Sequence, residues 1–518
     1  MEILQIQSDP FHFAFKTIFL HMKKITSLLS LICMLLFFQF KSEAQTILTL
    51  EKAMEIAVAN SPAIQSTVLN LQRTTESLNA QRAGLKSKFA LSLNPMDYSN
   101  SRKFDNRTSS WFTNELINSS GTFRVDQPIL ATDGKISLVN TFGWQSNTSD
   151  ASGNSNTNKA FSNNLYLSLA QPLFTYNRTK VALKTLELNN ENAQLSYSIQ
   201  RLALEKTVSQ LFYNVYMAQM SLTIREDENE NTQKSYEIIK NKVDAGLAAK
   251  EQLFQAEVNL ETSKSSKASA RVALESAKDQ FKQYVGMDIF EEISVITDVV
   301  VVPIDVDGKK ALEHGLASRM ELRQRQISIE TAMLDMNAVK AQNEFRGDLA
   351  LSIGVSGDNP TLGNIYDKPT QSPHYGITFN VPIFDWGQRA AQIRAQDAVI
   401  NSQKLNYSNQ DVQIKVDIRQ SIRNLSNLKD QISIALSNQK NSQLTYDINL
   451  ERYKNGDLTS MDLNLFQQQL SSNKMAYAQA LINYKLELLN LKIISLYDFT
   501  TGEAVIPDQY LHPKEAKK

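Results

Sequence analysis

The sequence consists of two similar halves, and this duplication restricts the fold more than any other feature. Residues 171–174, Gln-Pro-Leu-Phe, correspond to residues 381–384, Val-Pro-Ile-Phe, 210 positions later. Upstream, residues 89–93 correspond to residues 349–353 at an offset of 260 positions. The first half therefore contains about 50 additional residues between these two landmarks. A repeat this long indicates a duplicated domain rather than a solenoid of short repeats.

Each half contains segments in which apolar and polar residues alternate. Residues 349–357 and 374–383 follow this period of two in the second half, and residues 89–94 and 164–170 are the matching pair in the first half. A period of two is typical of β-strands with one apolar face. The second-half segments are about ten residues long, which is the length that a tilted membrane-spanning strand needs.

The additional residues of the first half leave the number of strands open between four and six. Residues 121–130 and 135–145 are two further candidate strands, joined by a tight turn at residues 132–134. Their alternation is interrupted by three polar residues, namely Arg124, Asp126 and Asn140.

After each strand pair the pattern becomes helical for a long distance. Residues 253–284 and 414–436 carry apolar or small side chains at steps of three and four, which is typical of coiled coils. Residues 388–453 contain no glycine or proline, so the sequence predicts a helix of about 65 residues and about 100 Å. Gly246 and Gly456 are expected to mark hairpin tips where the chain reverses.

The strands determine how the chain must assemble. A strand in lipid needs every backbone group paired, so the sheet must close on itself. Four or six strands are too few for closure, since the smallest single-chain barrels have eight. Several copies of the chain are therefore expected to share one barrel. A purely fibrous coiled coil is the alternative interpretation of the helices, but it does not account for the amphipathic strands.

The N-terminus resembles an export signal. Lys23 and Lys24 precede an apolar run over residues 25–40, and Ser42 and Ala44 are the small residues that a signal peptidase reads. We predict a signal peptide over residues 22–44, preceded by a mis-assigned extension over residues 1–21. A membrane anchor is the competing interpretation, but the apolar run is shorter than the roughly 20 residues that span a bilayer.

Composition excludes several other classes of protein. The chain has 54 basic and 54 acidic residues, so no excess of positive charge favours nucleic acid as a partner. Mean hydropathy is −0.32, which argues against a bundle of membrane-spanning helices. The single cysteine, Cys33, lies in the predicted signal, so a disulfide framework is excluded. The three histidines after the signal are isolated, and no metal, cofactor or catalytic constellation is predicted.

Taken together, these residues resemble the outer membrane efflux protein family, whose namesake is TolC. The resemblance covers nearly all of the predicted mature chain. It is carried by residues 48–53 and 60–62, the two strand–helix junctions at residues 172–174 and 382–387, the tips at Gly246 and Gly456, and residues 283–286. It implies a homotrimer with a β-barrel in outer-membrane lipid and a coiled-coil α-helical barrel in the periplasm, a mixed α and β fold. Its implied partners are a periplasmic adaptor protein and an inner-membrane pump.

The resemblance also suggests site residues at the tips. Tyr453 and Asp462 match a latch tyrosine and the first of two constricting aspartates of the family, while Leu465 stands at the second aspartate position. Leu458 and Gln252 replace the latch arginine and its aspartate partner, so we predict a hydrogen bond between Tyr453 and Gln252. Adaptor contacts are expected at the hairpin tips, through Gly246, Leu247, Gly456, Asp457 and Leu458.

These features predict a passive conduit for efflux or type I secretion rather than an enzyme. A structural periplasmic coiled-coil protein anchored in the outer membrane is the alternative. We divide the chain into a first repeat over residues 45–297, with strands at about 87–172 and a tip at 243–249, and a second repeat over residues 298–503, with strands at about 348–383 and a tip at 453–460. A charged tail over residues 504–518 follows. The cargo is not predictable from the sequence.

Overall fold

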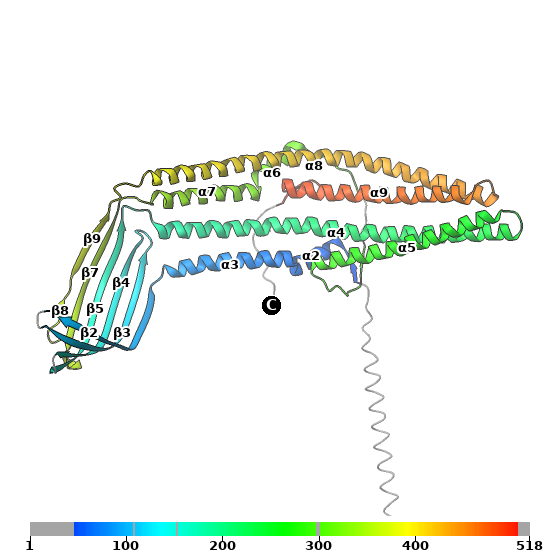
Figure 1. The fold of residues 1–518 in the computed structure, drawn as a ribbon. Helices are drawn as coiled ribbons and strands as arrows, with labels where there is room; N and C mark the ends of the chain where they lie inside the picture. Colours follow the sequence, from blue (N-terminus) through cyan, green and yellow to red (C-terminus); the bar gives the residue numbers. More distant parts are fainter. Residues whose placement is uncertain (1–45, 107–108, 152–153, 297–300, 506–518) are drawn as a thin grey trace, which may run out of the picture.

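The computed structural model describes residues 46–106, 109–151, 154–296 and 301–505. The predicted extension, the signal peptide and most of the tail lie outside these ranges, as does the predicted boundary between the repeats at residues 297 and 298. A β-sheet forms one end of the molecule, and long helices extend from it side by side (Figure 1). None of the described helices has the length and apolar character needed to cross a bilayer.

Two very long helices run nearly the whole length of the helical part. Helix α4 (Arg178–Asp244) has 67 residues and α8 (Gln388–Asn455) has 68, so each is about 100 Å long. The long helix predicted between residues 388 and 453 is confirmed. Since neither helix is interrupted by proline or glycine, nothing in the backbone breaks its ladder of hydrogen bonds.

Shorter helices pair with each long one. Helices α3 (Pro62–Gly84) and α5 (Lys250–Val285) pack along α4, whereas α7 (Met320–Lys340) and α9 (Ser460–Ser495) pack along α8. The two halves meet where α4 contacts α7 and α9. Near the sheet the helices therefore lie in the order α3, α4, α7, α8, and at the far end in the order α5, α4, α9, α8 (Figure 1).

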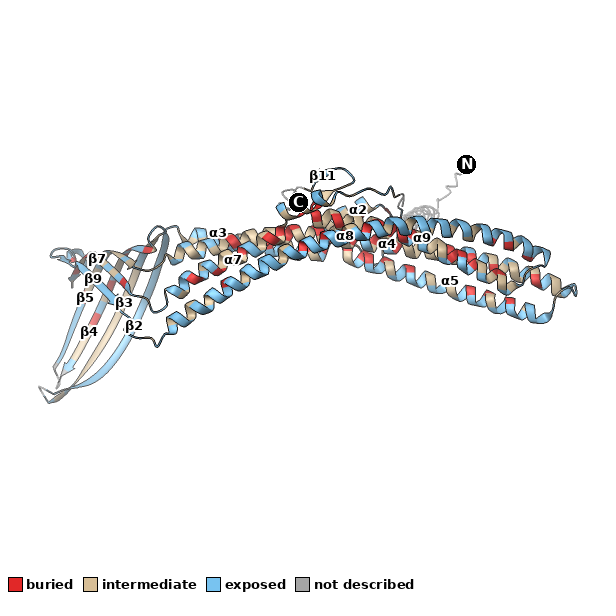
Figure 2. Cartoon of the chain, turned by 90° about the horizontal axis from the view of Figure 1, so that it is seen from above, coloured by how far each residue is buried: buried red, intermediate tan, exposed pale blue. Residues whose placement is uncertain are grey.

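The main core lies near the middle of the helical part, where α3 gives way to α5 along α4. Phe212 of α4 and Phe281 of α5 are fully buried there and meet edge to face, with ring centroids 6.3 Å apart. Helix α2 (Leu50–Asn60) covers them, together with the parallel pair of β1 (Thr46–Leu48) and β6 (Ile293–Val295). Figure 2 shows buried residues concentrated along the helices and few in the sheet.

A second core belongs to the other half. Helix α6 (Gly308–Ala317) packs on α8 and α9 through Ala311, Ile418 and Leu491. The described part of the chain closes with the small antiparallel pair β10 (Tyr497–Asp498) and β11 (Glu503–Ala504), so the residues just after α9 are held by backbone pairing.

The predicted heptad seams are only partly continuous. In α5 every seam residue from Leu253 to Tyr284 is buried or half-buried. In α8 the seam holds from Ile414 to Ile432, but Leu436 is exposed and the contacts pass to Tyr446 and Tyr453. A nearly straight helix has 3.6 residues per turn, so a line of contacts drifts away from a strict seven-residue repeat.

The sheet has six antiparallel strands, which decides between the two alternatives. In order they are β2 (Lys88–Asp105), β3 (Ser110–Ile129), β4 (Gly134–Ala151), β5 (Asn154–Leu173), β7 (Arg346–Asn359) and an edge strand made of β8 (Thr370–Gln371) and β9 (His374–Asn380). Both edge segments pair with β7 in one register, so they form a single strand interrupted at Pro373, which has no N–H to donate. A short 3₁₀ helix (Leu362–Asn364) lies in the loop between β7 and β8.

The additional residues of the first half are the hairpin formed by β3 and β4. The chain turns between these strands at Asp133, which has a positive φ of 61°. Its carboxylate accepts a hydrogen bond from the backbone N–H of Thr179, near the start of α4. The predicted turn at residues 132–134 is confirmed, and it is fixed to the first turn of the long helix.

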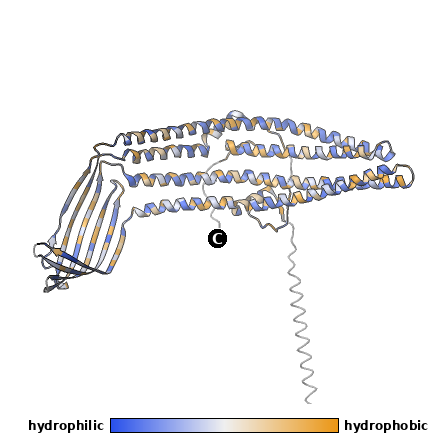
Figure 3. Cartoon of the chain, viewed as in Figure 1, coloured by the Kyte–Doolittle hydropathy of each residue, from blue (hydrophilic) through white to orange (hydrophobic). Residues whose placement is uncertain are grey.

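The strand register separates an apolar face from a polar one. Phe123 lies opposite Leu91 on β2 and Asn140 on β4, and Asn140 lies opposite Leu165. The exposed apolar residues of this face include Phe89, Leu91, Leu93, Phe123, Ile136, Leu138, Phe142, Leu165, Leu167, Ile353, Tyr375, Ile377 and Phe379. Figure 3 shows the alternation along the strands. Arg124 and Asp126 do not interrupt this pattern, because they belong to the polar face.

The strands of the first half are longer than predicted. They have 18 to 20 residues, whereas the alternation suggested about ten. The apolar face of β4 runs only from Ile136 to Trp144, which matches the nine to eleven residues needed to cross lipid. The distal parts of β4 and β5 are rich in Ser, Asn and Thr, so they continue the ladder beyond the apolar band without an apolar pattern to reveal them.

The end of α5 depends on a glycine, which gives a direct test of this fold. Gly286 has φ of 80°, and a Cβ atom placed there would lie 2.5 Å from the carbonyl oxygen of Asn60. We expect Gly286→Ala to destabilise the protein by about 2–4 kcal/mol, combining left-handed strain with the clash. Thermal unfolding measures the loss.

Gly246→Ala is the matched control, because Gly246 has φ of 73° but no atom within 4 Å of an added Cβ. It should cost only about 1 kcal/mol. Equal losses for the two variants would contradict the close approach of α2 to the end of α5.

Candidate functional site

The two hairpin tips lie together at the end of the helices farthest from the sheet (Figure 1). One tip joins α4 to α5 at Gly246, and the other joins α8 to α9 at Gly456, where φ is 91°. Their helices are held together by α4 packing on α9. The duplication therefore places the two glycine turns, 210 residues apart in sequence, at the same end of the molecule.

The tip turns present a mixed surface. Leu247 is 79% exposed, and Gly246, Gly456 and Asp457 are exposed as well. Leu458 is half-buried and packs on the cluster of apolar side chains beneath the tips. The predicted contact residues are thus accessible, except for Leu458, which partly supports the tip from inside.

Tyr453 is a buried anchor of the tip. It is only 1% exposed and packs with Ile239 of α4 and Leu463 of α9. Its hydroxyl donates a hydrogen bond to the carbonyl oxygen of Ser235 at 3.0 Å, which ties the end of α8 to α4. Burial raises the pKa of Tyr453 to about 12, so the phenol stays neutral throughout the physiological range.

The predicted hydrogen bond between Tyr453 and Gln252 is not present. Gln252 lies in the first turn of α5 and is exposed. The Tyr453 ring points instead into the cluster shared by α4, α8 and α9, because an aromatic side chain gains more from burial there than from a partner on the exposed surface.

Lys242 is a tip residue that the sequence analysis missed. Its ammonium donates to the carbonyl oxygen of Tyr453 at 3.4 Å and lies 5.7 Å from the centre of the Tyr453 ring. A cation at the C-terminal end of α8 interacts favourably with the helix dipole and with the ring. The available signal was a lysine in the last turn of α4, four residues before Gly246. Lys242 thus links the two tips.

Asp462 lies in the first turn of α9, the helix that follows the second tip. Its carboxylate accepts a hydrogen bond from the Thr459 hydroxyl at 2.6 Å, while the Asp462 N–H donates to the same hydroxyl at 3.2 Å. This is the N-terminal cap of α9, where a carboxylate also suits the helix dipole. The side chain is half-buried, and Leu465 one turn later is 62% exposed.

A buried polar layer lies a few turns from the tips. Glu228 of α4 is buried and forms an ion pair with Arg225, Oε2 to Nη1, at 2.6 Å. Gln467 of α9 donates to the Glu228 carbonyl oxygen at 3.2 Å, and Asn229 donates to the Ser263 hydroxyl of α5 at 2.8 Å. These bonds fix the positions of α4, α5 and α9 relative to one another along their axes. Apolar contacts alone define these positions less precisely.

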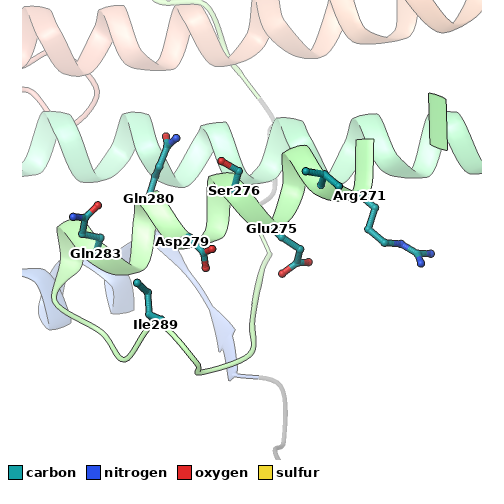
Figure 4. A pocket seen from close by; sticks show the side chains of 8 residues that line it. Arg271, Glu275, Ser276, Asp279, Gln280, Gln283 and Ile289 are labelled. Atoms are coloured by element: carbon teal, nitrogen blue, oxygen red, sulfur yellow. The ribbon is translucent and has the colours of Figure 1, made fainter. Parts of the chain in front are cut away.

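No group of three or more His, Cys, Asp or Glu side chains within the described residues could hold a metal ion. The hollow in Figure 4 is an open depression on the outer side of α5 and its following loop. It is lined by Arg271, Val272, Glu275, Ser276, Asp279, Gln280, Gln283 and Ile289. Because α5 is an edge helix of the protomer, this depression is a surface feature and not an enclosed site.

Comparison with known proteins identifies the family. The family model for outer membrane efflux proteins matches residues 135–287 and 311–494, which is most of the chain. The chain belongs to the outer membrane efflux protein family. It is therefore an outer-membrane channel component of efflux systems, a passive conduit that extends into the periplasm.

Individual relatives agree with this assignment. The cation efflux system protein CusC of Escherichia coli (strain K12) is 24% identical over 335 residues, covering 63% of this chain and 70% of CusC. The CmeC outer membrane channel of Campylobacter jejuni has a TM-score of 0.68 at 13% identity and covers 90% of each chain. A crystal structure of CusC has a TM-score of 0.63 at 15% identity, covering 86% of this chain and 91% of that one. The solved structures establish the fold.

The Lys242 link gives a test of the tip. Lys242→Met should remove about 0.5–1 kcal/mol of attraction between α4 and the end of α8 and loosen the two tips. We expect faster amide hydrogen exchange around Tyr453 and a larger single-channel conductance.

Lys240→Met is the matched control, since Lys240 is exposed on the same helix two residues away. Equal behaviour of the two variants would show that Lys242 does not hold the tips.

Proposed function

We propose that three copies of this chain form one closed barrel and one helical tunnel, and that the tunnel tips dock a periplasmic adaptor linked to an inner-membrane pump. The observation that best supports this proposal is the open sheet. Its edge strands are β2 and the strand formed by β8 and β9, and an even number of strands makes them antiparallel to each other. The edge of one copy can therefore pair with the opposite edge of the next, and three times six strands gives a closed barrel of eighteen.

The edge helices support the same assembly. On α5, Val258 and Val272 are 60% and 70% exposed, and on α8, Leu444 and Ile448 are both 62% exposed. These helices are the two outer members of the row at the tips, so each presents apolar side chains in the direction where a neighbouring copy would lie. Contact of α5 with α8 of the next copy would cover both surfaces.

Electrical recordings of the purified protein test this proposal. A trimer in planar bilayers should give stable channels, and cross-linking should give a mass of three chains. A structural periplasmic coiled-coil protein would give neither channels nor a closed barrel. The name of CusC refers to cations, and the cargo of the present chain would be set by the pump to which it is coupled.

The adaptor contact is expected at the exposed tips. Gly246→Arg places a large charged side chain at the turn between α4 and α5, so it should abolish adaptor capture in a pull-down and reduce efflux at least about tenfold, the loss expected when about 1.4 kcal/mol of binding energy is removed. Gly246→Ala controls for the backbone strain at this position. Retained capture by the arginine variant would contradict the assignment.

Asp462 is proposed to form a ring of three carboxylates near the periplasmic mouth. Rings of aspartate favour cations locally, so Asp462→Ala should lower the permeability of the channel to potassium relative to chloride. The reversal potential under a KCl gradient measures this.

Thr459→Ala is the control, because it removes the helix cap but keeps the charge. Unchanged selectivity in the Asp462→Ala channel would leave Asp462 as a capping residue only.

A further inference from the structure

Charged residues at the base of the sheet gather on one face. The base is defined here as the six residues of each long strand that lie nearest the helices. Its charged residues are Lys88, Arg124, Asp126, Lys135, Arg346 and Asp348. Lys88 lies opposite Asp126, and Arg124 lies between Ala90 and Val139, so these side chains share the polar face. By the same alternation Lys135, Arg346 and Asp348 share it as well.

The charges of this base cluster do not cancel. The base cluster contains four cations and two carboxylates, which gives it a net charge of +2 per chain. Lys135 Nζ lies 3.8 Å from Asp126 Oδ1, and Arg346 Nε lies 3.7 Å from Asp348 Oδ2. In the described part of the chain, no carboxylate oxygen lies within 4.0 Å of the charged nitrogens of Lys88 or Arg124. Both side chains are exposed on the polar face.

Half of this cluster comes from the hairpin that the second repeat lacks. Arg124 and Asp126 belong to β3, and Lys135 belongs to β4. Asp126 is further engaged by the Ser137 hydroxyl, which donates to Asp126 Oδ1 at 2.5 Å, so the carboxylate is held within its own hairpin. The insertion therefore adds charge to the polar face in addition to adding strands.

We propose that the base cluster makes the inner end of the barrel selective for anions. This inference rests on the proposed trimer, in which the apolar face meets lipid and the polar face lines the lumen. Three copies would place a ring with a net charge of +6 around the passage, and rings of Arg and Lys favour anionic solutes in pores. Low-dielectric barrel walls strengthen this field along the lumen. The solutes favoured would be small anions and cargo bearing carboxylate or phosphate groups.

Selectivity for chloride over potassium tests the proposal directly. Reversal potentials are measured for single channels under a KCl gradient near 0.1 M, where the screening length is about 10 Å. The double variant Lys88→Gln with Arg124→Gln should lower the chloride-to-potassium permeability ratio about twofold or more, because the ring loses its unpaired cations. Asp126→Asn should raise the ratio.

Lys159→Gln is the matched control. Lys159 is exposed on β5 and lies, by strand register, on the outer face beyond the apolar band. Lys159→Gln removes one positive charge per chain, against two in the double variant, and leaves the lumen unaltered, so its permeability ratio should equal that of the unmodified channel. An equal shift in this control would overturn the proposal, since the effect would then be one of total charge.

The outcomes separate this inference from the function on which it rests. Absence of channels and trimers from the unmodified protein would overturn the proposed assembly itself. Trimeric, conducting double variants with an unchanged permeability ratio would overturn only the anion selectivity. Thermal unfolding of each variant, compared with the unmodified trimer, identifies any loss caused by misfolding.

Discussion

The need to pair every backbone N–H and C=O group in lipid governs this molecule. A single protomer satisfies it for the inner strands of its sheet but leaves β2 and the strand of β8 and β9 open at the edges. Burial of the apolar side chains in lipid would be possible in many arrangements of the sheet. An unpaired backbone group in hydrocarbon, however, costs so much free energy that no arrangement with open edges is stable. In the proposed assembly, further copies of the chain complete the fold, and each protomer is one sector of a larger closed structure.

The helical part is likewise built from two similar halves, but its stability depends on side-chain packing between helices. Each long helix is joined along its length by two shorter ones, α3 and α5 beside α4, and α7 and α9 beside α8. The junction between the short helices would leave a gap in the packing. The aromatic residues Phe212 and Phe281 fill it in the first half, together with α2 and the β1–β6 pair. The largest core of the described residues thus lies where α3 begins and α5 ends, and not along the middle of either helix.

The features that depend on local periodicity could be predicted from the sequence, whereas those that depend on tertiary contacts could not. The long helices, the tip glycines and the alternating faces follow from patterns that repeat every few residues. The distal halves of β4 and β5 were missed because strands outside lipid need no apolar side. Arg124 and Asp126 were misjudged as interruptions, although they alternate with Phe123 and Val125, and the register places them on the polar face. At the tips, Lys242 was missed because its partner, Tyr453, lies 211 residues away in the chain.

The broken edge strand sets where the assembled barrel is weakest. Pro373 interrupts the edge, and β9 offers only seven residues, whereas the neighbouring β2 has 18. The joint between copies would thus carry fewer backbone hydrogen bonds than the joints among β2, β3, β4, β5 and β7. The joint of β7 with the edge strand is equally short, but its two strands belong to one chain and stay tethered. Under mechanical load or denaturant the ring would part along three such lines first and release intact six-stranded panels. Dissociation of the copies would then precede unfolding of the strands, so the assembly would come apart in two separable stages.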